Sequence, residues 1–432
     1  MTIGTKTGGR DATQGVIEGR FALSVGKPTR LPEPLGYAWT PLSKVARLES
    51  GHTPSRSRPE YWDGEIPWIG IRDATGNHGK TIRSTGQTIT QAGLDNSSAR
   101  LLPTGTVCLS RTASVGYVVQ MGVPMATSQD FVNWVCGPDL SPDYLKYVLL
   151  GEQDSIRRFA HGTTHQTMYY PEAKALHALL PERSIQDAVA AVLGALDDKI
   201  TANAKLAATA QSLAESIFLK AAHSVPGGAA AAMTFDDVAV IQGGATPSTK
   251  IEEYWGGDIN WATPTDVTAL ESPYLFETSR RITPAGLDAC SSALHPAGSI
   301  LMTSRATIGA FALAQLPTAV NQGFIVVNAH DPTLQVWLFH EMRRRVPEFV
   351  SHANGATFLE LPRGRFKKLP LSVPDSEIAR RFNDRATPLH ARARGAALES
   401  ELLGRTRDAL LPELMSGKLA VKDAERVAEG VV

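Results

Sequence analysis

Between residues 184 and 220 the larger apolar side chains recur every three or four positions, in an Ala-rich stretch that contains no proline. This spacing is typical of one face of an α-helix and predicts a single long helix. At 1.5 Å per residue such a helix is about 55 Å long, which is more than one compact domain can enclose. We therefore predict a rod that separates other parts of the chain.

Positions seven residues apart form two adjoining rows along this helix, as in the seam of a coiled coil. The predicted seam residues are Val189, Val192, Leu196, Asn203, Leu206, Leu213 and Ile217. Asn203 is of a type that fixes the register of such a seam at some cost in stability. Because the rows are not uniformly apolar, periodicity alone leaves open an amphipathic helix that packs only on its own domain.

The chain before this helix is repeated after it. The segments EYWDGEIPW and EYWGGDINW place Tyr61 and Tyr254 193 positions apart, and the same offset relates Gly162 to Gly355. This period far exceeds the roughly 20 to 50 residues of a solenoid repeat, so it predicts two whole domains of one fold. Each copy combines short β-rich runs, such as 106–109 and 131–135, with helical stretches. We expect α+β domains with a mostly antiparallel or mixed sheet.

A second long helix is predicted after Pro374, with Phe382, Leu389, Leu403 and Leu410 on its seam. Pro388 has no backbone N–H, so it should kink this helix or break its first turns. The two helices are expected to pack antiparallel as a coiled coil and to hold the domains in a pseudo-twofold arrangement. A short echo of residues 19–23 in residues 417–421 indicates that the chain ends meet and close the molecule into a ring.

The repeat and the helices divide the chain into seven predicted segments. These are an N-terminal arm (1–36) that docks on the C-terminal region, a first domain (37–182), a central helix (183–222), a linker (223–232), a second domain (233–375), a C-terminal helix (376–412) and a tail (413–432).

Composition narrows the class of protein. Of the 432 residues, 43 are Lys or Arg and 43 are Asp or Glu, so nucleic-acid binding would have to rest on local patches. The three cysteines lie far apart without metal-ligand spacing, which favours a reducing compartment over a disulfide framework. No stretch approaches the roughly 20 apolar residues of a membrane helix, and the first residues lack the apolar core of a secretory signal. We expect a cytoplasmic protein.

The sequence lacks the signatures of catalysis. It contains no zinc-ligand spacing, no triphosphate-binding loop, no nucleophile elbow and no adenine-methyltransferase tetrapeptide. A nuclease site built from Asp143, Asp197 and Asp198 is disfavoured, because the last two lie on the long helix far downstream. We therefore expect neither catalytic residues nor a metal site.

Binding chemistry is better represented, because Arg and Lys clusters accompany loops rich in Ser, Thr, Asn, His and Gln. Such cations hold phosphate oxygens and such polar side chains read base edges, although a solvated surface is the alternative for each cluster. The candidate DNA contacts are Ser55, Arg56, Arg58, Arg72, Asn77, His78, Lys80, Arg111, Thr112, Arg157, Thr163, Thr164, His165, Gln166, Ser248, Thr249, Lys250, Thr265, Ser304, Arg305, Asn354, Thr357, Arg363 and Arg365.

The two copies keep a Tyr-Trp-x-Gly-x-Ile-x-Trp frame but differ in their loops. Arg72 and Lys80 of the first copy, for example, face Thr265 and Pro273 of the second. A shared scaffold with different loops is what two readers of different sequences would need. The aromatic residues of the frame are expected to be core rather than platforms for stacked bases.

Four features together resemble the specificity subunit of a type I restriction-modification enzyme. They are the arm GRDATQGVIEGRFALSVGKP, the twofold Gly-x-Thr-Pro-Ser with its Tyr-Trp frame, the long helices and the closing LLPELMSGKLAV. The resemblance covers nearly the whole chain. It implies two target recognition domains that each read one half of a bipartite, asymmetric site in double-stranded DNA, with the helices fixing the spacer between the halves.

The resemblance also implies partners and excludes a cofactor on this chain. The helices would bind two modification subunits, which carry S-adenosylmethionine and methylate adenine at N6. Restriction subunits, which are motor nucleases, would complete the complex. The specificity subunit would itself be non-catalytic and bind no cofactor. Pro388 departs from the family pattern of a regular second helix.

Two other hypotheses stay open on the sequence alone. One is a stand-alone DNA methyltransferase or nuclease with cryptic motifs, which the purified chain with DNA and labelled S-adenosylmethionine or magnesium would reveal. The other is a two-domain scaffold that binds protein, which salt-dependent DNA binding by the assembled complex would exclude.

Overall fold

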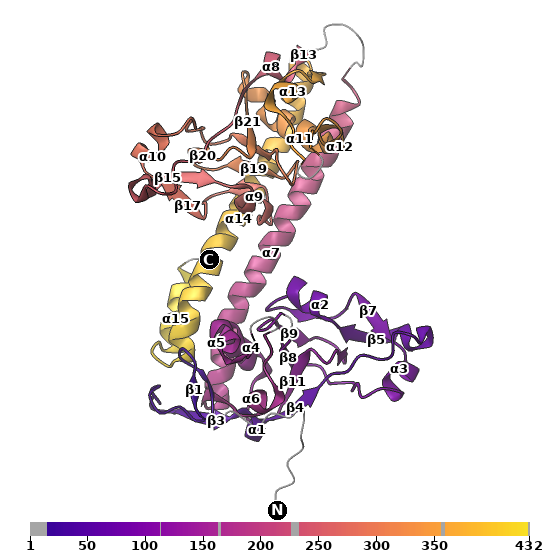
Figure 1. Ribbon diagram of the computed structural model, residues 1–432, viewed down its shortest axis with the longest axis vertical. Helices are drawn as coiled ribbons and strands as arrows, with labels where there is room; N and C mark the ends of the chain where they lie inside the picture. Colours follow the sequence, from indigo (N-terminus) through magenta and orange to yellow (C-terminus); the bar gives the residue numbers. More distant parts are fainter. Residues whose placement is uncertain (1–14, 113, 163–165, 226–232, 356–358, 431–432) are drawn as a thin grey trace, which may run out of the picture. The chain divides into compact units, whose positions relative to one another are not determined.

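The computed structural model describes residues 15–112, 114–162, 166–225, 233–355 and 359–430 (Figure 1). The chain forms two compact units, one made of residues 1–198 with 402–432 and the other of residues 199–401. Two 40-residue helices, α7 (Arg183–Ala222) and α14 (Ser376–Met415), each contribute a part to both units. In the described part of the chain, no helix is both long enough and apolar enough to cross a membrane.

The first copy of the repeat contains a five-stranded and a three-stranded sheet. In sheet order, the first consists of β4 (Ala46–Ser50), β11 (Phe131–Cys136), β8 (Val107–Ser110), β9 (Val118–Met121) and β6 (Thr81–Ile82). The second consists of β10 (Ala126–Thr127), β5 (Trp62–Ile69) and β7 (Gln87–Ile89). Pairing is antiparallel except for β6 with β9 and β10 with β5. β8 and β9 are buried along their whole length, and α4 (Pro142–Gly151) lies against both.

The second copy has the same topology. Its sheets run β14 (Ala239–Gln242), β21 (Phe324–Ala329), β18 (Ile300–Thr303), β19 (Phe311–Ala314), β16 (Tyr274–Leu275), and β17 (Arg280–Ile282), β15 (Trp255–Ala262), β20 (Thr318–Val320). The parallel pairs, β16 with β19 and β15 with β20, occupy the places they have in the first copy. The prediction of duplicated α+β domains with mixed sheets is confirmed.

Short helices connect these strands. In the first unit they are α1 (Leu42–Val45), η1 (Pro59–Tyr61), α2 (Ile71–Gly76), α3 (Gln91–Asp95), α5 (Gln153–Phe159), α6 (Tyr170–Lys174) and α15 (Val421–Glu429). In the second they are α8 (Phe235–Val238), η2 (Glu252–Tyr254), α9 (Pro264–Thr268), α10 (Pro284–Asp288), η3 (Pro332–Leu334), α11 (Gln335–Arg344), α12 (Val346–Ser351) and α13 (Arg363–Lys367). A two-stranded sheet pairs β13 (Met233–Thr234) with β22 (Pro370–Leu371).

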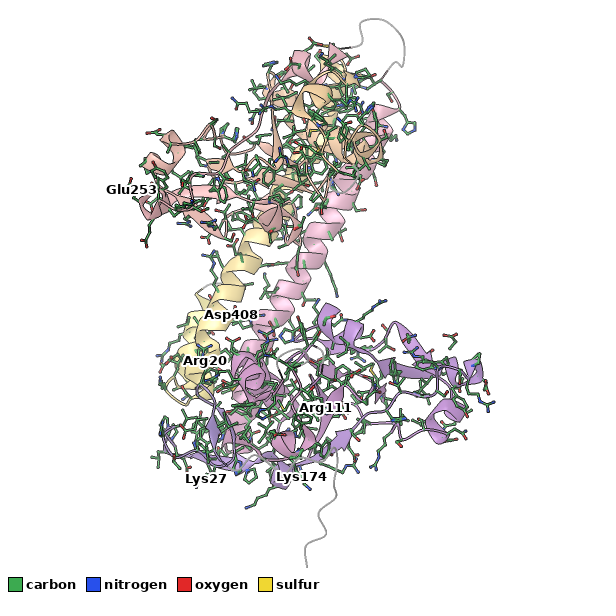
Figure 2. The ribbon with its side chains drawn as sticks, viewed as in Figure 1. Arg20, Lys27, Arg111, Lys174, Glu253 and Asp408 are labelled. Carbon is green, nitrogen blue, oxygen red and sulfur yellow. The ribbon has the colours of Figure 1, made fainter. Side chains whose placement is uncertain are left out.

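The N-terminal arm is anchored in the first unit by a buried carboxylate. Its strands β1 (Ile17–Glu18) and β2 (Leu23–Val25) continue a sheet with β12 (Leu176–Pro181) and β3 (Tyr37–Pro41). The fully buried Glu152 accepts hydrogen bonds from the backbone N–H groups of Arg20 (2.8 Å), Phe21 (2.7 Å) and Ala22 (2.7 Å); Figure 2 labels Arg20. The arm therefore docks on its own copy of the repeat.

The arm also reaches α14. A Cβ added at Gly151 would come within 2.8 Å of Phe21 Cζ and 3.1 Å of Leu411 Cδ2, so both side chains border this glycine. At the position equivalent to Glu152 the second copy has Arg345, which pairs with Glu348 Oε1 at 2.6 Å. The buried carboxylate is thus specific to the copy that receives an arm.

Helices α7 and α14 run antiparallel in the second unit and also contact each other in the first. In the second unit Lys199 lies 3.2 Å from Glu399, whereas Phe218, nineteen residues further along, packs on Phe382. In the first unit Asp197 Oδ1 accepts from Arg407 at 2.7 Å. Contacts whose residue numbers rise on one helix and fall on the other define an antiparallel pair, as predicted.

Two details of the helix predictions are wrong. The Leu213 side chain is 50 % exposed, because the buried row of α7 in the second unit is Asn203, Ala207, Ala210, Ala214 and Phe218. This spacing follows the 3.6-residue turn of a straight α-helix rather than the 3.5-residue heptad. Pro388 does not break α14, which is helical from Ser376 to Met415, so the predicted break is wrong and the predicted kink stays a prediction. Pro388 is exposed, so the carbonyl that loses its hydrogen bond to the proline can be solvated.

Candidate DNA interface

A pair of tryptophans fixes the entry loop of the first copy against β5. The rings of Trp62 and Trp68 meet edge to face with centroids 5.2 Å apart. Trp68 Nε1 donates to the carbonyl of His52 at 3.0 Å, and Trp62 Nε1 donates to that of Ser55 at 3.1 Å. The loop that carries Ser55 therefore has a defined position, because both of its ends are bonded to the same strand.

The second copy repeats this frame contact for contact. Trp255 and Trp261 meet edge to face at 5.0 Å, and their Nε1 atoms donate to Ser248 O and Ala245 O, each at 3.1 Å. Trp68 and Trp261 are buried, as the sequence predicted, whereas Trp62 and Trp255 are only half-buried. Each half-buried tryptophan therefore leaves part of its ring available to other groups.

An aspartate holds the next loop in both copies. Asp73 accepts from the N–H groups of Gly70 (2.9 Å) and Gly86 (2.8 Å). Asp266 accepts from Thr263 (2.7 Å) and Ser279 (2.8 Å) in the equivalent places. Burial opposes ionisation of Asp266, yet hydrogen bonds from Thr263 and Ser279 hold its pKa below the ordinary value. These carboxylates are structural. Asp73 links the start of α2 to the residue before β7, and Asp266 links the start of α9 to the residue before β17.

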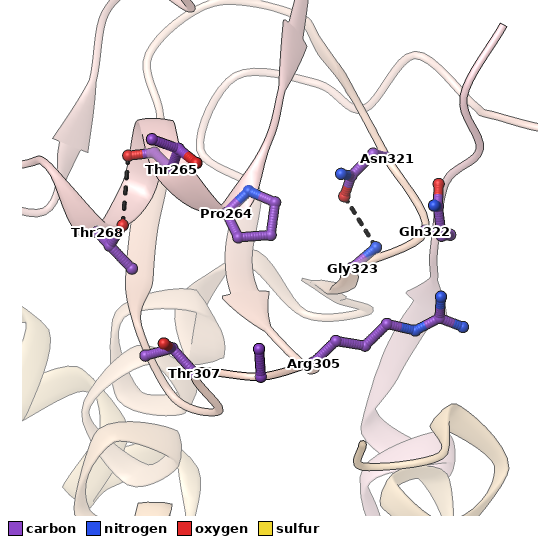
Figure 3. A pocket seen from close by; sticks show the side chains of 9 residues that line it. Pro264, Thr265, Thr268, Arg305, Thr307, Asn321, Gln322 and Gly323 are labelled. Atoms are coloured by element: carbon purple, nitrogen blue, oxygen red, sulfur yellow. Dashed lines mark hydrogen bonds between the residues drawn. The ribbon is translucent and has the colours of Figure 1, made fainter. Parts of the chain in front are cut away.

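A pocket opens beside this frame in each copy. The first, of about 740 Å³, is lined by Thr53, Arg56, Trp68, Gly70, Ile71, Arg72, Asp73, Gly86, Gln87, Ser128, Gln129 and Asp130. The second, of about 300 Å³, is lined by Pro264, Thr265, Thr268, Arg305, Ala306, Thr307, Asn321, Gln322 and Gly323 (Figure 3). The pairs Arg72 and Thr265, and Gln129 and Gln322, are equivalent by the offset of 193. The two pockets therefore occupy the same place in the repeat.

The polar chemistry of the two pockets differs. The first has Arg72 on α2, where the second has Thr265. The second has Arg305 on the loop after β18, where the first copy has Thr112, which donates to Asp130 Oδ1 at 2.7 Å. Arg305 itself pairs with Glu360 at 2.9 Å. Arg72 and Arg305 thus enter the two pockets from different elements.

Many of the predicted contacts lie on the surface of these domains. Arg56 and Arg72 line the first pocket, and Thr265 and Arg305 line the second. Arg111, labelled in Figure 2, borders the first through Nε, which donates to Gln129 O at 3.1 Å; its partial burial lowers its pKa. Exposed residues that line neither pocket are Ser55, Arg58, Lys80, Gln166, Ser248, Thr249, Lys250, Asn354, Arg363 and Arg365.

Three predicted contacts are engaged within the fold instead. Ser304 is only 4 % exposed, so its prediction as a surface contact is wrong. His78 Nδ1 accepts from Val118 N–H at 3.1 Å, and burial, with the nearby Arg157 guanidinium, lowers the His78 pKa. Asn77 Nδ2 donates to Asp73 O at 2.9 Å and closes the end of α2. Arg157 is partly exposed and lies 3.5 Å from Asp154.

The remaining predicted contacts, Thr163, Thr164, His165 and Thr357, lie outside the described residues. Sequence reasoning missed the pocket residues Gln87, Ser128, Gln129, Asp130, Asn321 and Gln322. A signal for two of them was present, because Gln129 and Gln322 match at the repeat offset and both are exposed. A repeated exposed polar residue is not explained by core packing.

Comparison with known proteins identifies the family. Residues 36–211 and 231–386 each match the type I restriction modification DNA specificity domain. The two matches cover most of the chain, which therefore belongs to this family.

Individual relatives are similar over shorter stretches. The MjaIX specificity subunit of Methanocaldococcus jannaschii is 38 % identical over 143 residues, which are 33 % of each chain. The EcoprrI specificity subunit of Escherichia coli is 32 % identical over 103 residues, 24 % of this chain and 25 % of that one. The chain thus aligns with about a third or less of the length of these two relatives.

A solved structure shares the fold along nearly the whole chain. The crystal structure of the type I restriction-modification system S subunit from M. genitalium superposes with a TM-score of 0.57 at 15 % identity. The match covers 89 % of this chain and 98 % of that chain.

Proposed function

We propose that this chain is the DNA-specificity subunit of a type I restriction-modification complex, in which each copy of the repeat reads one half of a bipartite, asymmetric DNA site. One observation carries the proposal: two pockets at the same place in a common frame present different polar side chains. A reader of two unlike half-sites needs the same support twice and different contacts on it.

The pocket residues suit base recognition in chemical type. Arginine forms two hydrogen bonds with guanine, and Asn or Gln with adenine, in the major groove. The first pocket offers Arg72 and Gln129, and the second offers Arg305, Asn321 and Gln322. Because the frame fixes the loops by hydrogen bonds and tryptophan packing, these side chains can approach DNA from defined positions.

Assembly with other subunits is part of the proposal. Two modification subunits bind the long helices, carry S-adenosylmethionine and methylate adenine at N6, and restriction subunits join them to form the nuclease complex, all in the cytoplasm. Exposed leucines on the helices of the second unit, Leu213 at 50 %, Leu219 at 39 % and Leu398 at 43 %, support a docking role. This chain would bind no cofactor and contribute specificity alone.

Methylome sequencing tests the proposal directly. Cells that carry this chain with its modification subunits should show a single bipartite motif of methylated adenines. Replacing residues 37–182 by the corresponding domain of a relative should change one half of that motif and leave the other half and the spacer length unchanged. A motif with both halves unaltered after the exchange would refute the assignment of half-site reading to this domain.

A further inference from the structure

An arginine lies on the face of the half-buried tryptophan in both copies, but it comes from two different places in the sequence. Arg56 Cζ is 3.8 Å from the Trp62 ring centroid, and Arg280 Cζ is 3.5 Å from that of Trp255. By the repeat offset, the position of Arg56 corresponds to Thr249, and that of Arg280 corresponds to Gln87. Each copy therefore has a guanidinium at the equivalent position on its tryptophan ring, although a different sequence position supplies it.

The structure shows how this exchange is possible. In the first copy Arg56 Nη2 donates to Gln87 Oε1 at 3.0 Å, so the two positions are neighbours beside the tryptophan ring. An arginine at the position of Arg56 or at that of Gln87 can therefore reach the face of the tryptophan ring. The entry loop supplies it in the first copy and strand β17 supplies it in the second.

Both guanidinium groups keep their charge available. Arg56 and Arg280 are exposed, and no carboxylate in the described ranges pairs with either one. Their neighbours differ in this respect, because Arg58 lies 3.4 Å from Glu60 and Arg281 lies 3.6 Å from Glu277. Stacking on the indole restricts the guanidinium to one plane and directs its N–H groups sideways, where they can form hydrogen bonds with a second group.

We propose that Arg56 and Arg280 each hold a backbone phosphate of the DNA, as sequence-independent anchors of the two recognition domains. The inference rests on the proposed function. A residue that reads a base must differ between readers of unlike half-sites, whereas the phosphates are the same at every step. A cation kept at one point in both domains, in spite of a change in the residue that supplies it, has the property expected of a phosphate anchor.

Two other arginines of the pockets differ between the copies at the aligned positions, because Arg72 corresponds to Thr265 and Arg305 corresponds to Thr112. These residues are the ones left to distinguish bases. The two sets of arginines therefore divide the work of positioning and of specificity within each domain.

The test exchanges the two arrangements in the first domain. The full-length chain, assembled with its modification subunits, carries Arg56→Thr alone, or Arg56→Thr together with Gln87→Arg, which reproduces the residues of the second domain. Arg47→Ala is the matched control, because it removes an exposed charge of the same domain that already has a carboxylate partner, Glu49 at 3.1 Å. Binding is measured between 50 and 200 mM salt to a duplex with the native motif and to a duplex with scrambled half-sites.

An anchor predicts one pattern of results. Arg56→Thr should weaken binding to both duplexes by the same factor. The ratio of wild-type affinity to variant affinity should fall about threefold between 50 and 200 mM salt, as expected for the loss of one phosphate contact. The double variant should restore affinity, the control should match the wild type, and the methylated motif should be the same in every case.

Three results would overturn the inference. They are a changed motif, which would make Arg56 a base reader, unchanged affinity for both duplexes, which would leave it a packing role only, and failure of Gln87→Arg to restore binding. If Arg56→Thr does not assemble, the mirror exchange of Arg280→Gln with Thr249→Arg in the second domain gives the same test. Absence of motif-specific binding by the wild-type complex would instead refute the proposed function.

Discussion

The side-chain amide of Asn203 donates a 2.8 Å hydrogen bond to Glu399 Oε2 and so links α7 to α14 within the second unit. Lys199 Nζ reaches the other carboxylate oxygen at 3.2 Å. Asn203 is 5 % exposed and is flanked on the buried row by Ala207. The one polar residue of the predicted seam row therefore has a specific partner on the opposite helix.

Removing this amide should destabilise the helix pair. Asn203→Ala should lower the stability of the second unit by about 1 to 2 kcal/mol, because a hydrogen bond to a charged group is lost while Lys199 still neutralises Glu399. Urea denaturation followed by circular dichroism measures the effect. Lys205→Ala, an exposed change on the same helix, is the control, and equal midpoints for the two variants would show that the bond contributes nothing.

Glu152 should be essential for attachment of the arm. In Glu152→Gln one acceptor oxygen is replaced by an NH₂ group that faces backbone donors, so we expect a loss of at least about 2 kcal/mol in arm docking. Limited trypsinolysis should cleave faster after Arg20, which Figure 2 labels on the arm. Asp154→Asn removes an exposed carboxylate 3.8 Å from Arg20 and should leave the cleavage rate unchanged. Equal rates in both variants would refute the anchoring role.

A buried histidine pair should make the second unit sensitive to acid. His340 Nε2 and His390 Nε2 are 2.9 Å apart, and His390 Nδ1 lies 3.0 Å from the Tyr274 hydroxyl. Burial, the neighbouring imidazole and Arg343 lower the His340 pKa to about 3, and burial and Arg343 lower the His390 pKa to about 4. Both imidazoles are therefore neutral in the folded protein at pH values where the unfolded chain is protonated.

The sign of the pH effect follows from these pKa values. Below the ordinary pKa of about 6.5 the unfolded state binds more protons, so stability should fall as the pH decreases from 6.5 toward 4, by at most about 2.7 kcal/mol per pH unit for two protons. Denaturation between pH 7 and pH 5 should show a smaller slope in the double variant His340→Gln, His390→Gln. His223→Gln, an exposed histidine of the same unit, should keep the wild-type slope. A double variant with an unchanged slope would contradict the assignment.

Pro388 should be a tolerated defect in α14. Because it is exposed and its helix continues on both sides, Pro388→Ala should restore a backbone hydrogen bond and stabilise the second unit by about 1 to 3 kcal/mol. Gly395→Ala, where an added Cβ meets no atom within 4 Å, should stabilise the same helix by about 1 kcal/mol and calibrates the measurement. A lower melting temperature for Pro388→Ala would show that the helix requires the proline.

Arg72 should determine part of one half-site. Arg72→Thr installs the residue of the second copy and should cost about 1 to 3 kcal/mol of discrimination at one base pair, which methylome sequencing would detect as a relaxed position. Lys80→Ala, an exposed change outside the pocket, should leave the motif intact. An unaltered motif in Arg72→Thr would exclude it as a base reader.

The features that the sequence predicted correctly are those that follow from local spacing or from the repeat. The offset between Tyr61 and Tyr254 revealed the duplicated domains, and three- and four-residue spacing predicted both long helices. Seam positions were less certain, as Leu213 shows, because a heptad and a 3.6-residue period diverge after a few turns. The predicted break at Pro388 did not occur, because the free-energy cost of a proline in a helix depends on whether the carbonyl that loses its hydrogen bond is solvated.

The composition of the site required the tertiary structure. Gln129 and Asp130 reach the pocket of Arg72 only because β10 pairs with β5, which brings segments some sixty residues apart into contact. Repeat alignment made Arg56 and Arg280 look unrelated, and only their common place on a tryptophan face connected them. The sequence by itself determined the duplication, the rods and the frame, since these follow from local periodicity and repetition. Which polar groups share a pocket was decided by long-range packing, which no local pattern records.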